Sequence, residues 1–100
     1  MEEKQTIKFG HKLKLLRKKH FLSQEDLAEL SKLDRKYISN LERDVSSPTL
    51  ETLYKLAAAF GITYLELSQE ISEVEENQNY LISATKEVEE IKAMQKNKKQ

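Results

Sequence analysis

The sequence contains no cysteine, and this absence removes several kinds of site at once. Without Cys the chain cannot form a disulfide, offer a thiolate nucleophile or bind zinc or an iron–sulfur cluster through sulfur. Two glycines and one proline leave few positions that break a helix. The longest apolar run, residues 56–60, is far shorter than the roughly 18 to 20 residues that cross a bilayer. With a charged N-terminus that is unlike a signal peptide, these absences indicate a helical, cytoplasmic protein without a membrane span.

Patterns typical of enzymes are also missing. His11 and His20 do not have the histidine–carboxylate spacing of a zinc site. There is no glycine-rich phosphate loop and no serine flanked by glycines, so neither nucleotide chemistry nor a serine nucleophile is indicated. We therefore expect a protein without catalytic activity, metal or cofactor.

Charge is balanced over the whole chain but unevenly distributed along it. Lys and Arg together number 17, as do Asp and Glu, so the formal net charge is zero. Residues 4–19 nevertheless carry seven basic side chains and no acidic one, whereas residues 61–90 carry eight Glu and one Lys. The basic segment could face phosphates or could be an ordinary solvated helix face, and charge does not decide between the two.

Apolar spacing and capping residues predict five short helices in residues 6–69. Lysines alternate with apolar residues three to four apart in the first, over about residues 6–20. The second to fifth helices are expected over about residues 24–31, 35–43 and 50–60 and from residue 64 onward. Their N-caps are Ser23, Asp34, Thr49 and Thr63, and Gly61 stands where a left-handed residue would end the fourth. The predicted fold class is all-α.

Residues 70–100 predict a helical extension to the domain of residues 1–69. Residues 70–97 contain no Gly or Pro, so one unbroken helix is expected, followed by a disordered tail over residues 96–100. With Val74 at heptad position a, positions a and d carry a mixed stripe that is most apolar over residues 81–91. Glu87 then falls at g and Lys92 at e, where they could pair between parallel helices. The helix could alternatively fold back onto the domain or fray.

Residues 24–43 predict a helix-turn-helix, in which a turn of three or four residues joins two helices. Ala28 is small where the helices must approach each other. The side chains expected in the shared core are Leu27, Leu30, Leu33, Ile38 and Leu41. The groups left facing outward are of the kinds that contact DNA: Arg35, Lys36, Ser39, Asn40 and Arg43, with Tyr37 at the margin.

Four segments in this order resemble the helix-turn-helix family of phage repressors, Cro proteins and xenobiotic-response-element regulators. They are SQEDLA from residue 23, YISNLER from 37, SPTLETL from 47 and AAFGI from 58. The resemblance covers roughly residues 7–68, and residues 33–39 with Glu42 and Arg43 are most similar to the controller proteins of restriction–modification systems. It implies a five-helix domain of a transcriptional regulator that binds double-stranded DNA as a two-fold homodimer, with the third helix in the major groove. An inverted-repeat operator is then expected.

Side-chain chemistry and the resemblance together assign roles in DNA binding. The planar fork of Arg35 suits guanine O6 and N7, and Asn40 could pair with an adenine edge. Gln24 opens the second helix, where its side chain and free backbone N–H groups can bind a phosphate, as the resemblance also implies. The remaining candidates for bases, sugars or phosphates are Lys36, Ser39, Tyr37, Arg43, Ser46 and Thr49, of which Tyr37 could instead be partly buried.

The resemblance gives Arg17 and Glu42 a structural role, because this family joins an Arg of the first helix to a Glu late in the third. We expect a partly buried ion pair, with an exposed pair of little energetic value as the alternative. The chain departs from the family at the interhelix turn, where Lys32 replaces a common Gly and a left-handed backbone would cost about 1–2 kcal/mol. Asp34, an acid close to the expected DNA, should direct its carboxylate at amides of the third helix.

A different class of function is a protein-binding regulator, such as an antitoxin. In that case residues 70–95 would bind another protein. The acidic stretch of residues 66–76 and the apolar stripe of residues 81–91 motivate this alternative. A toxin that co-purifies with the chain would favour this alternative over a DNA-binding homodimer.

Overall fold

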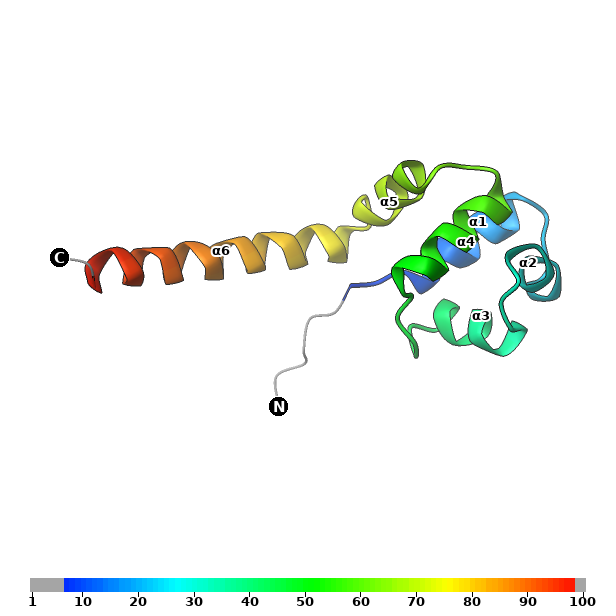
Figure 1. Ribbon diagram of the computed structural model, residues 1–100, viewed down its shortest axis with the longest axis horizontal. Helices are drawn as coiled ribbons and strands as arrows, with labels where there is room; N and C mark the ends of the chain where they lie inside the picture. The colour runs from blue at the N-terminus through cyan, green and yellow to red at the C-terminus, as the bar shows by residue number, and fades with distance from the viewer. Residues whose placement is uncertain (1–6, 99–100) are drawn as a thin grey trace.

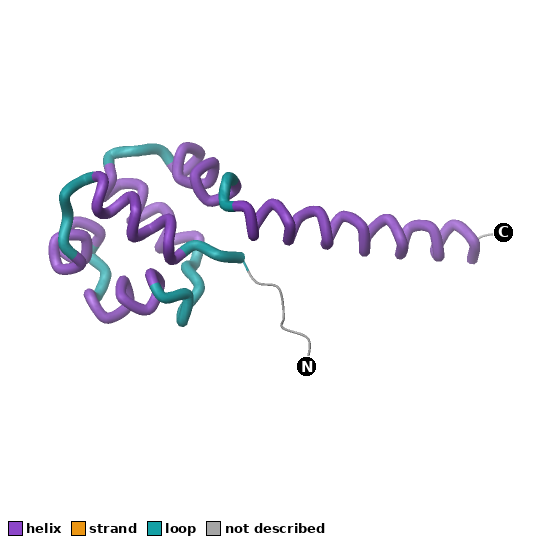
Figure 2. Tube along the Cα trace, turned by 180° about the vertical axis from the view of Figure 1, so that it is seen from behind, coloured by secondary structure: helices purple, strands orange, loops and turns teal. Residues whose placement is uncertain are grey.

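A computed structural model describes residues 7–98, and every regular element in these residues is a helix (Figures 1 and 2). The order is α1 (Gly10–Lys19), α2 (Gln24–Ser31), α3 (Arg35–Glu42), α4 (Leu50–Phe60), α5 (Tyr64–Ser72) and α6 (Glu75–Lys98). Helices α1 to α5 pack around one core, whereas α6 leaves this body as a single rod. The predicted all-α class is confirmed, and no helix in the described residues is long and apolar enough to span a membrane.

Each helix from α1 to α5 contributes at least one side chain with no exposed surface to the core. These side chains are Leu13, Leu27, Ile38, Leu41, Leu56 and Leu67. The amphipathic spacing in the sequence therefore identifies the buried face of each helix. Burial of this kind is the main source of stability for short helices, which are marginal in isolation.

The prediction that Leu30 belongs to this core is wrong, because its side chain is 56% exposed. The buried face of α2 runs through Leu27 and Ser31, which are four residues apart, so Leu30 is rotated away from it. The buried Ser31 hydroxyl donates to the Leu27 carbonyl oxygen at 2.6 Å and is satisfied within its own helix. Leu33 is only partly buried against the core.

The first helix begins at Gly10, four residues later than expected, and residues 1–6 lie outside the described part of the chain. Asp44 Oδ1 accepts the backbone N–H groups of Phe9 at 3.1 Å and Gly10 at 2.9 Å, so a distant carboxylate caps α1. Gly10 also lies against the end of α3, where a Cβ atom would overlap the Glu42 carbonyl group. Only glycine permits this close approach of α1 to α3.

Most of the predicted caps are present. Ser23 and Thr63 each form a capping box with the acidic residue three positions on, and the Thr49 side chain accepts the N–H of Thr52. Gly61 ends α4 in the left-handed conformation, with φ of 69°. Asp34 is the N-cap of α3, but its side chain makes no capping hydrogen bond, contrary to expectation. Because this helix end is exposed, its first N–H groups can bond water instead.

The turn between α2 and α3 keeps the left-handed geometry without a glycine. Lys32 ends α2 with φ of 59°, and its N–H donates to the Glu29 carbonyl oxygen. Lys32 therefore adopts the left-handed conformation itself, at a cost of about 1–2 kcal/mol in backbone strain. Phe21 and Asp44 also have positive φ, at 58° and 55°.

A break at Glu73 and Val74 replaces the unbroken helix expected over residues 70–97. Asn77 explains the break, because its Nδ2 donates to the Ile71 carbonyl oxygen at 2.9 Å near the end of α5. The same amide accepts the N–H of Lys8 at 2.6 Å and donates to the Lys8 carbonyl oxygen at 2.7 Å. A side chain thus satisfies the backbone where α5 ends, and neither Gly nor Pro is needed.

Beyond this junction α6 stands away from the body of the molecule. Asn77 is the one buried residue of α6, so the fold-back alternative is wrong. The helix continues to Lys98, so the expectation of disorder is wrong for residues 96–98, and residues 99–100 lie outside the described part.

Candidate nucleic-acid interface

The exposed side of α3 is the candidate surface for DNA. Ile38 and Leu41 anchor the opposite side of the helix in the core. Arg35, Lys36 and Arg43 are exposed, while Ser39 and Asn40 are half-buried. An eight-residue helix with a buried apolar face and a polar outer face has the form that can enter a major groove.

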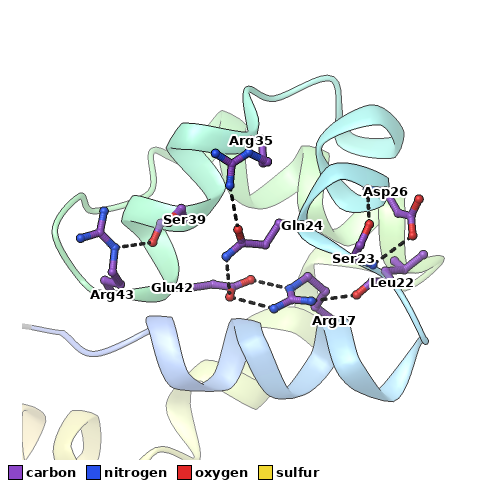
Figure 3. A network of polar contacts seen from close by, with 9 residues as sticks. All are labelled: Arg17, Leu22, Ser23, Gln24, Asp26, Arg35, Ser39, Glu42 and Arg43. Atoms are coloured by element: carbon purple, nitrogen blue, oxygen red, sulfur yellow. Dashed lines mark hydrogen bonds and ion pairs between the residues drawn. The ribbon is translucent and has the colours of Figure 1, made fainter.

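Behind this surface, Arg17 of α1 and Glu42 of α3 form a bidentate ion pair (Figure 3). The Nε···Oε2 distance is 2.7 Å and the Nη2···Oε1 distance is 3.1 Å. The two side chains are only 11% and 4% exposed, which places the pair inside the domain, as expected from the resemblance. Arg17 also donates to the Leu22 carbonyl oxygen at 2.8 Å. The hydrogen bond to Glu42 raises the pKa of Arg17 against the opposing effect of burial.

Gln24 connects this ion pair to the outer surface. Its Nε2 donates to Glu42 Oε1 at 3.2 Å, and its Oε1 accepts from Arg35 Nη1 at 3.3 Å. Figure 3 shows the resulting chain of polar contacts from Arg17 through Glu42 and Gln24 to Arg35. The side chain predicted to bind a phosphate therefore supports the side chain predicted to read a base.

The first turn of α2 has its own polar contacts beside Gln24. Ser23 Oγ accepts the Asp26 N–H, and Asp26 Oδ2 accepts the Ser23 N–H, both at 3.0 Å. The hydrogen bond that the Ser23 N–H donates to the Asp26 carboxylate lowers the pKa of Asp26. Glu25 Oε1 lies 3.7 Å from Arg35 Nε, in an exposed pair that contributes little to stability.

Asn40 and Arg43 contact each other at the other end of α3. Arg43 Nη2 donates to Asn40 Oδ1 at 2.6 Å, and Arg43 Nε donates to the Ser39 carbonyl oxygen at 3.4 Å. The Asn40 carbonyl oxygen accepts the N–H groups of Val45 and Ser46. Bidentate pairing of Asn40 with adenine needs its amide oxygen as an acceptor, so Arg43 would have to release that atom first.

Tyr37 and Thr49 meet through a residue that the sequence did not single out. The Tyr37 hydroxyl lies 3.2 Å from Thr52 Oγ1, which lies 3.0 Å from Thr49 Oγ1. Thr52 is buried, and Tyr37 packs partly against the core. The Tyr37 side chain therefore joins α3 to the start of α4, in line with the alternative of partial burial. In the sequence, Thr52 stands three residues after the N-cap Thr49, but nothing in the sequence indicates Tyr37 as its partner.

Asp44 is the second residue of this surface that sequence reasoning missed. It lies in the loop that also carries Ser46 and Thr49, and it caps α1 through Phe9 and Gly10. Its partners are 35 and 34 residues away in the chain, so no local pattern indicates the contact. The candidate phosphate-binding loop is thereby tied to the start of α1.

Comparison with known proteins identifies the family. The sequence profile described as helix-turn-helix matches residues 13–67, which is more than half of the chain. The chain belongs to the helix-turn-helix family. Within it, the chain is 47% identical over 66 residues to the control protein C.MunI of a Mycoplasma species, a match that covers 65% of this chain and 89% of that protein. The predicted resemblance is therefore confirmed.

Two further relatives support this assignment to the helix-turn-helix family. The chain is 38% identical over 69 residues to the immunity repressor of Bacillus phage phi105, covering 69% of this chain and 48% of the repressor. A solved structure, the restriction–modification controller protein C.AhdI of Aeromonas hydrophila, matches with a TM-score of 0.57 at 46% identity. That match covers 61% of this chain and 92% of the controller chain.

Proposed function

We propose that the chain is a sequence-specific transcriptional regulator without catalytic activity, which binds double-stranded DNA as a homodimer at an inverted repeat. The observation that carries this proposal is the supported, exposed Arg35 at the start of α3. The relatives named above are control proteins and a repressor, which favours this function over an antitoxin-like role and suggests a controller of restriction–modification genes.

Arg35 is suited to base reading by its position and by its weak existing contacts. Its guanidinium makes one hydrogen bond at 3.3 Å to Gln24 and lies 3.7 Å from Glu25, both at an exposed surface. Guanine O6 and N7 can replace these contacts with two shorter, charge-assisted hydrogen bonds. Because Gln24 is itself bonded to Glu42, the side chain beside Arg35 is ordered before DNA arrives.

The other predicted contacts surround this base-reading position. Lys36 is exposed one residue further along α3 and is proposed to bind a base or phosphate. At the far end of α3, Arg43 and the loop that follows present charged and polar groups for the backbone. The proposed phosphate and sugar contacts are Gln24, Tyr37, Arg43, Ser46 and Thr49. Ser39 is proposed to contact a base or phosphate, and Asn40 an adenine edge.

The homodimer is supported by exposed apolar side chains on α4 and α5. Leu50 is 59% exposed, Tyr54 56% and Leu65 66%. Tyr54 also stacks on Tyr64 of α5, with ring centroids 4.7 Å apart. Apolar and aromatic groups exposed together on a small domain indicate a protein contact, and a second copy would use the same surface in a two-fold interface.

Selection of bound duplexes from a random DNA pool at about 150 mM salt tests this function, because non-specific phosphate binding weakens at that salt while base reading persists. We expect an inverted repeat whose half-sites are centred about 10 base pairs apart. A single half-site without symmetry would contradict the homodimer. Folded protein that enriches no sequence would contradict the function itself.

A further inference from the structure

Helix α6 presents apolar side chains that nothing in the described chain covers. Leu81 is 66% exposed, Val88 48% and Ile91 54%, on a helix that also carries many charged side chains and further exposed apolar ones such as Ile82 and Met94. The family match ends at residue 67, so α6 lies outside the matched residues. Its function must therefore be derived from its own residues.

These apolar residues form one seam along the rod. Leu81, Ala84, Val88 and Ile91 follow each other at spacings of three, four and three residues, which is the a and d pattern of a two-stranded coiled coil. Ile82, 67% exposed, lies one position off the seam and is not part of it. A helix with such a seam buries it best against a second helix of the same kind.

The charged residues beside the seam favour a second copy of α6 as the partner and a parallel orientation of the two helices. In a parallel, in-register pair, Glu87 at position g of one helix faces Lys92 at position e of the other, and the symmetric pair repeats this contact. An antiparallel pair centred on the same seam would bring the two Glu87 side chains close together, where like charges repel. The complementarity is therefore between two copies of this helix that run in the same direction.

The base of the seam is fixed to the domain. Asn77 occupies the d position before Leu81, and its three hydrogen bonds to Lys8 and Ile71 attach the start of α6 to the body. The seam thus begins where the domain ends, and both copies in a two-fold dimer would present it from the same place.

We propose that α6 pairs with α6 of a second copy as a short parallel coiled coil through Leu81, Ala84, Val88 and Ile91. The inference rests on the proposed homodimer but not on its DNA sequence specificity. It gives the homodimer a second contact, separate from the apolar surface of α4 and α5.

The absence of native cysteine allows a direct test in the full chain by disulfide formation. Leu81→Cys and Ile91→Cys should each form linked dimers under mild oxidation, because identical seam positions meet in a parallel pair at distances a disulfide can span. Linking should be about tenfold faster than for Ile82→Cys, the matched control off the seam, because pairing raises the local thiol concentration. Equal rates for all three variants would overturn the proposal.

A mixture of Leu81→Cys and Ile91→Cys, one of them carrying a mass tag, tests whether the two helices run parallel or antiparallel. An antiparallel pair would link Leu81→Cys only to Ile91→Cys, and that result would overturn the parallel arrangement. Adding Arg35→Ala to Leu81→Cys should leave the linking rate unchanged while it weakens operator binding. Failure of the coiled coil is thereby distinguishable from failure of the proposed DNA function.

The charge pattern supplies a second, independent measurement. Glu87→Lys should raise the dissociation constant for self-association by about tenfold, since two opposite-charge contacts per dimer become like-charge contacts. Adding Lys92→Glu should restore the original value. No rescue by the double variant would contradict the assigned pairing of Glu87 with Lys92.

Discussion

Apolar side chains have similar spacing in the body of α1 to α5 and in the rod of α6, but they are buried in the body and exposed in the rod. In the body, Leu13 and Leu56 have no exposed surface, whereas Leu81 in the rod is 66% exposed. The spacing determines which face of a helix is apolar, but the rest of the chain determines whether that face has a partner. The body contains the partners of its own helices, whereas the apolar face of α6 has none in the described residues, and we propose that another copy supplies it.

Of the substitutions that compare the two regions, one that breaks the Arg17–Glu42 ion pair should lower the free energy of unfolding the most. Glu42→Gln leaves Arg17 charged in a site where its side chain is 11% exposed, so the free energy of unfolding should fall by about 3–5 kcal/mol. Glu90→Gln, an exposed acid on α6, should change it by less than about 0.5 kcal/mol. Urea denaturation monitored by circular dichroism measures both. A loss below about 1 kcal/mol for Glu42→Gln would contradict the structural role.

A matched pair of isoleucines compares the two regions without involving charge. Ile38→Ala removes a side chain with no exposed surface and should lower the free energy of unfolding by about 2–5 kcal/mol. Ile82→Ala removes one that is 67% exposed and off the seam, so it should have little effect. The urea midpoint of each variant provides the comparison. Similar losses at both positions would mean that α6 packs against something on its outer face.

Replacing a lysine with glycine should stabilise the body at Lys32 and destabilise α6 at Lys86. Lys32→Gly relieves the left-handed backbone of the interhelix turn and should raise the free energy of unfolding by about 1 kcal/mol. Lys86→Gly lies within the regular α6 and should weaken that helix by about 1 kcal/mol, seen as a loss of helical signal. Destabilisation by Lys32→Gly would show that the lysine side chain contributes more than the strain costs.

Local chemistry made much of the body predictable. Ser23, Thr49, Thr63 and Gly61 act within one turn of their own positions, so the sequence alone reveals their caps. Apolar spacing likewise identified the most buried side chains, but it did not separate them from exposed ones such as Leu15, Leu30 and Leu65. The Arg17–Glu42 contact spans 25 residues and was predicted only because the chain resembles a known family.

The features that could not be predicted depend on contacts between distant residues. Asp44 sets the start of α1 from 34 residues away, and Asn77 determines the α5–α6 break by binding Lys8, 69 residues away. Neither an isolated Asp nor an isolated Asn has a local pattern that names such a partner. The Gln24 bridge is similar, because its two contacts become evident only once α2 and α3 are placed together.

Base reading by Arg35 is the central claim, and parallel selections of bound duplexes by the wild-type chain and Arg35→Ala test it most directly. We predict that both proteins select the same half-site spacing, and that the variant loses preference for guanine at one symmetric position, at a cost of about 1–3 kcal/mol in discrimination. Arg43→Ala should weaken binding to all sequences alike, which provides the matched control. An unchanged preference at every position in Arg35→Ala would contradict the claim.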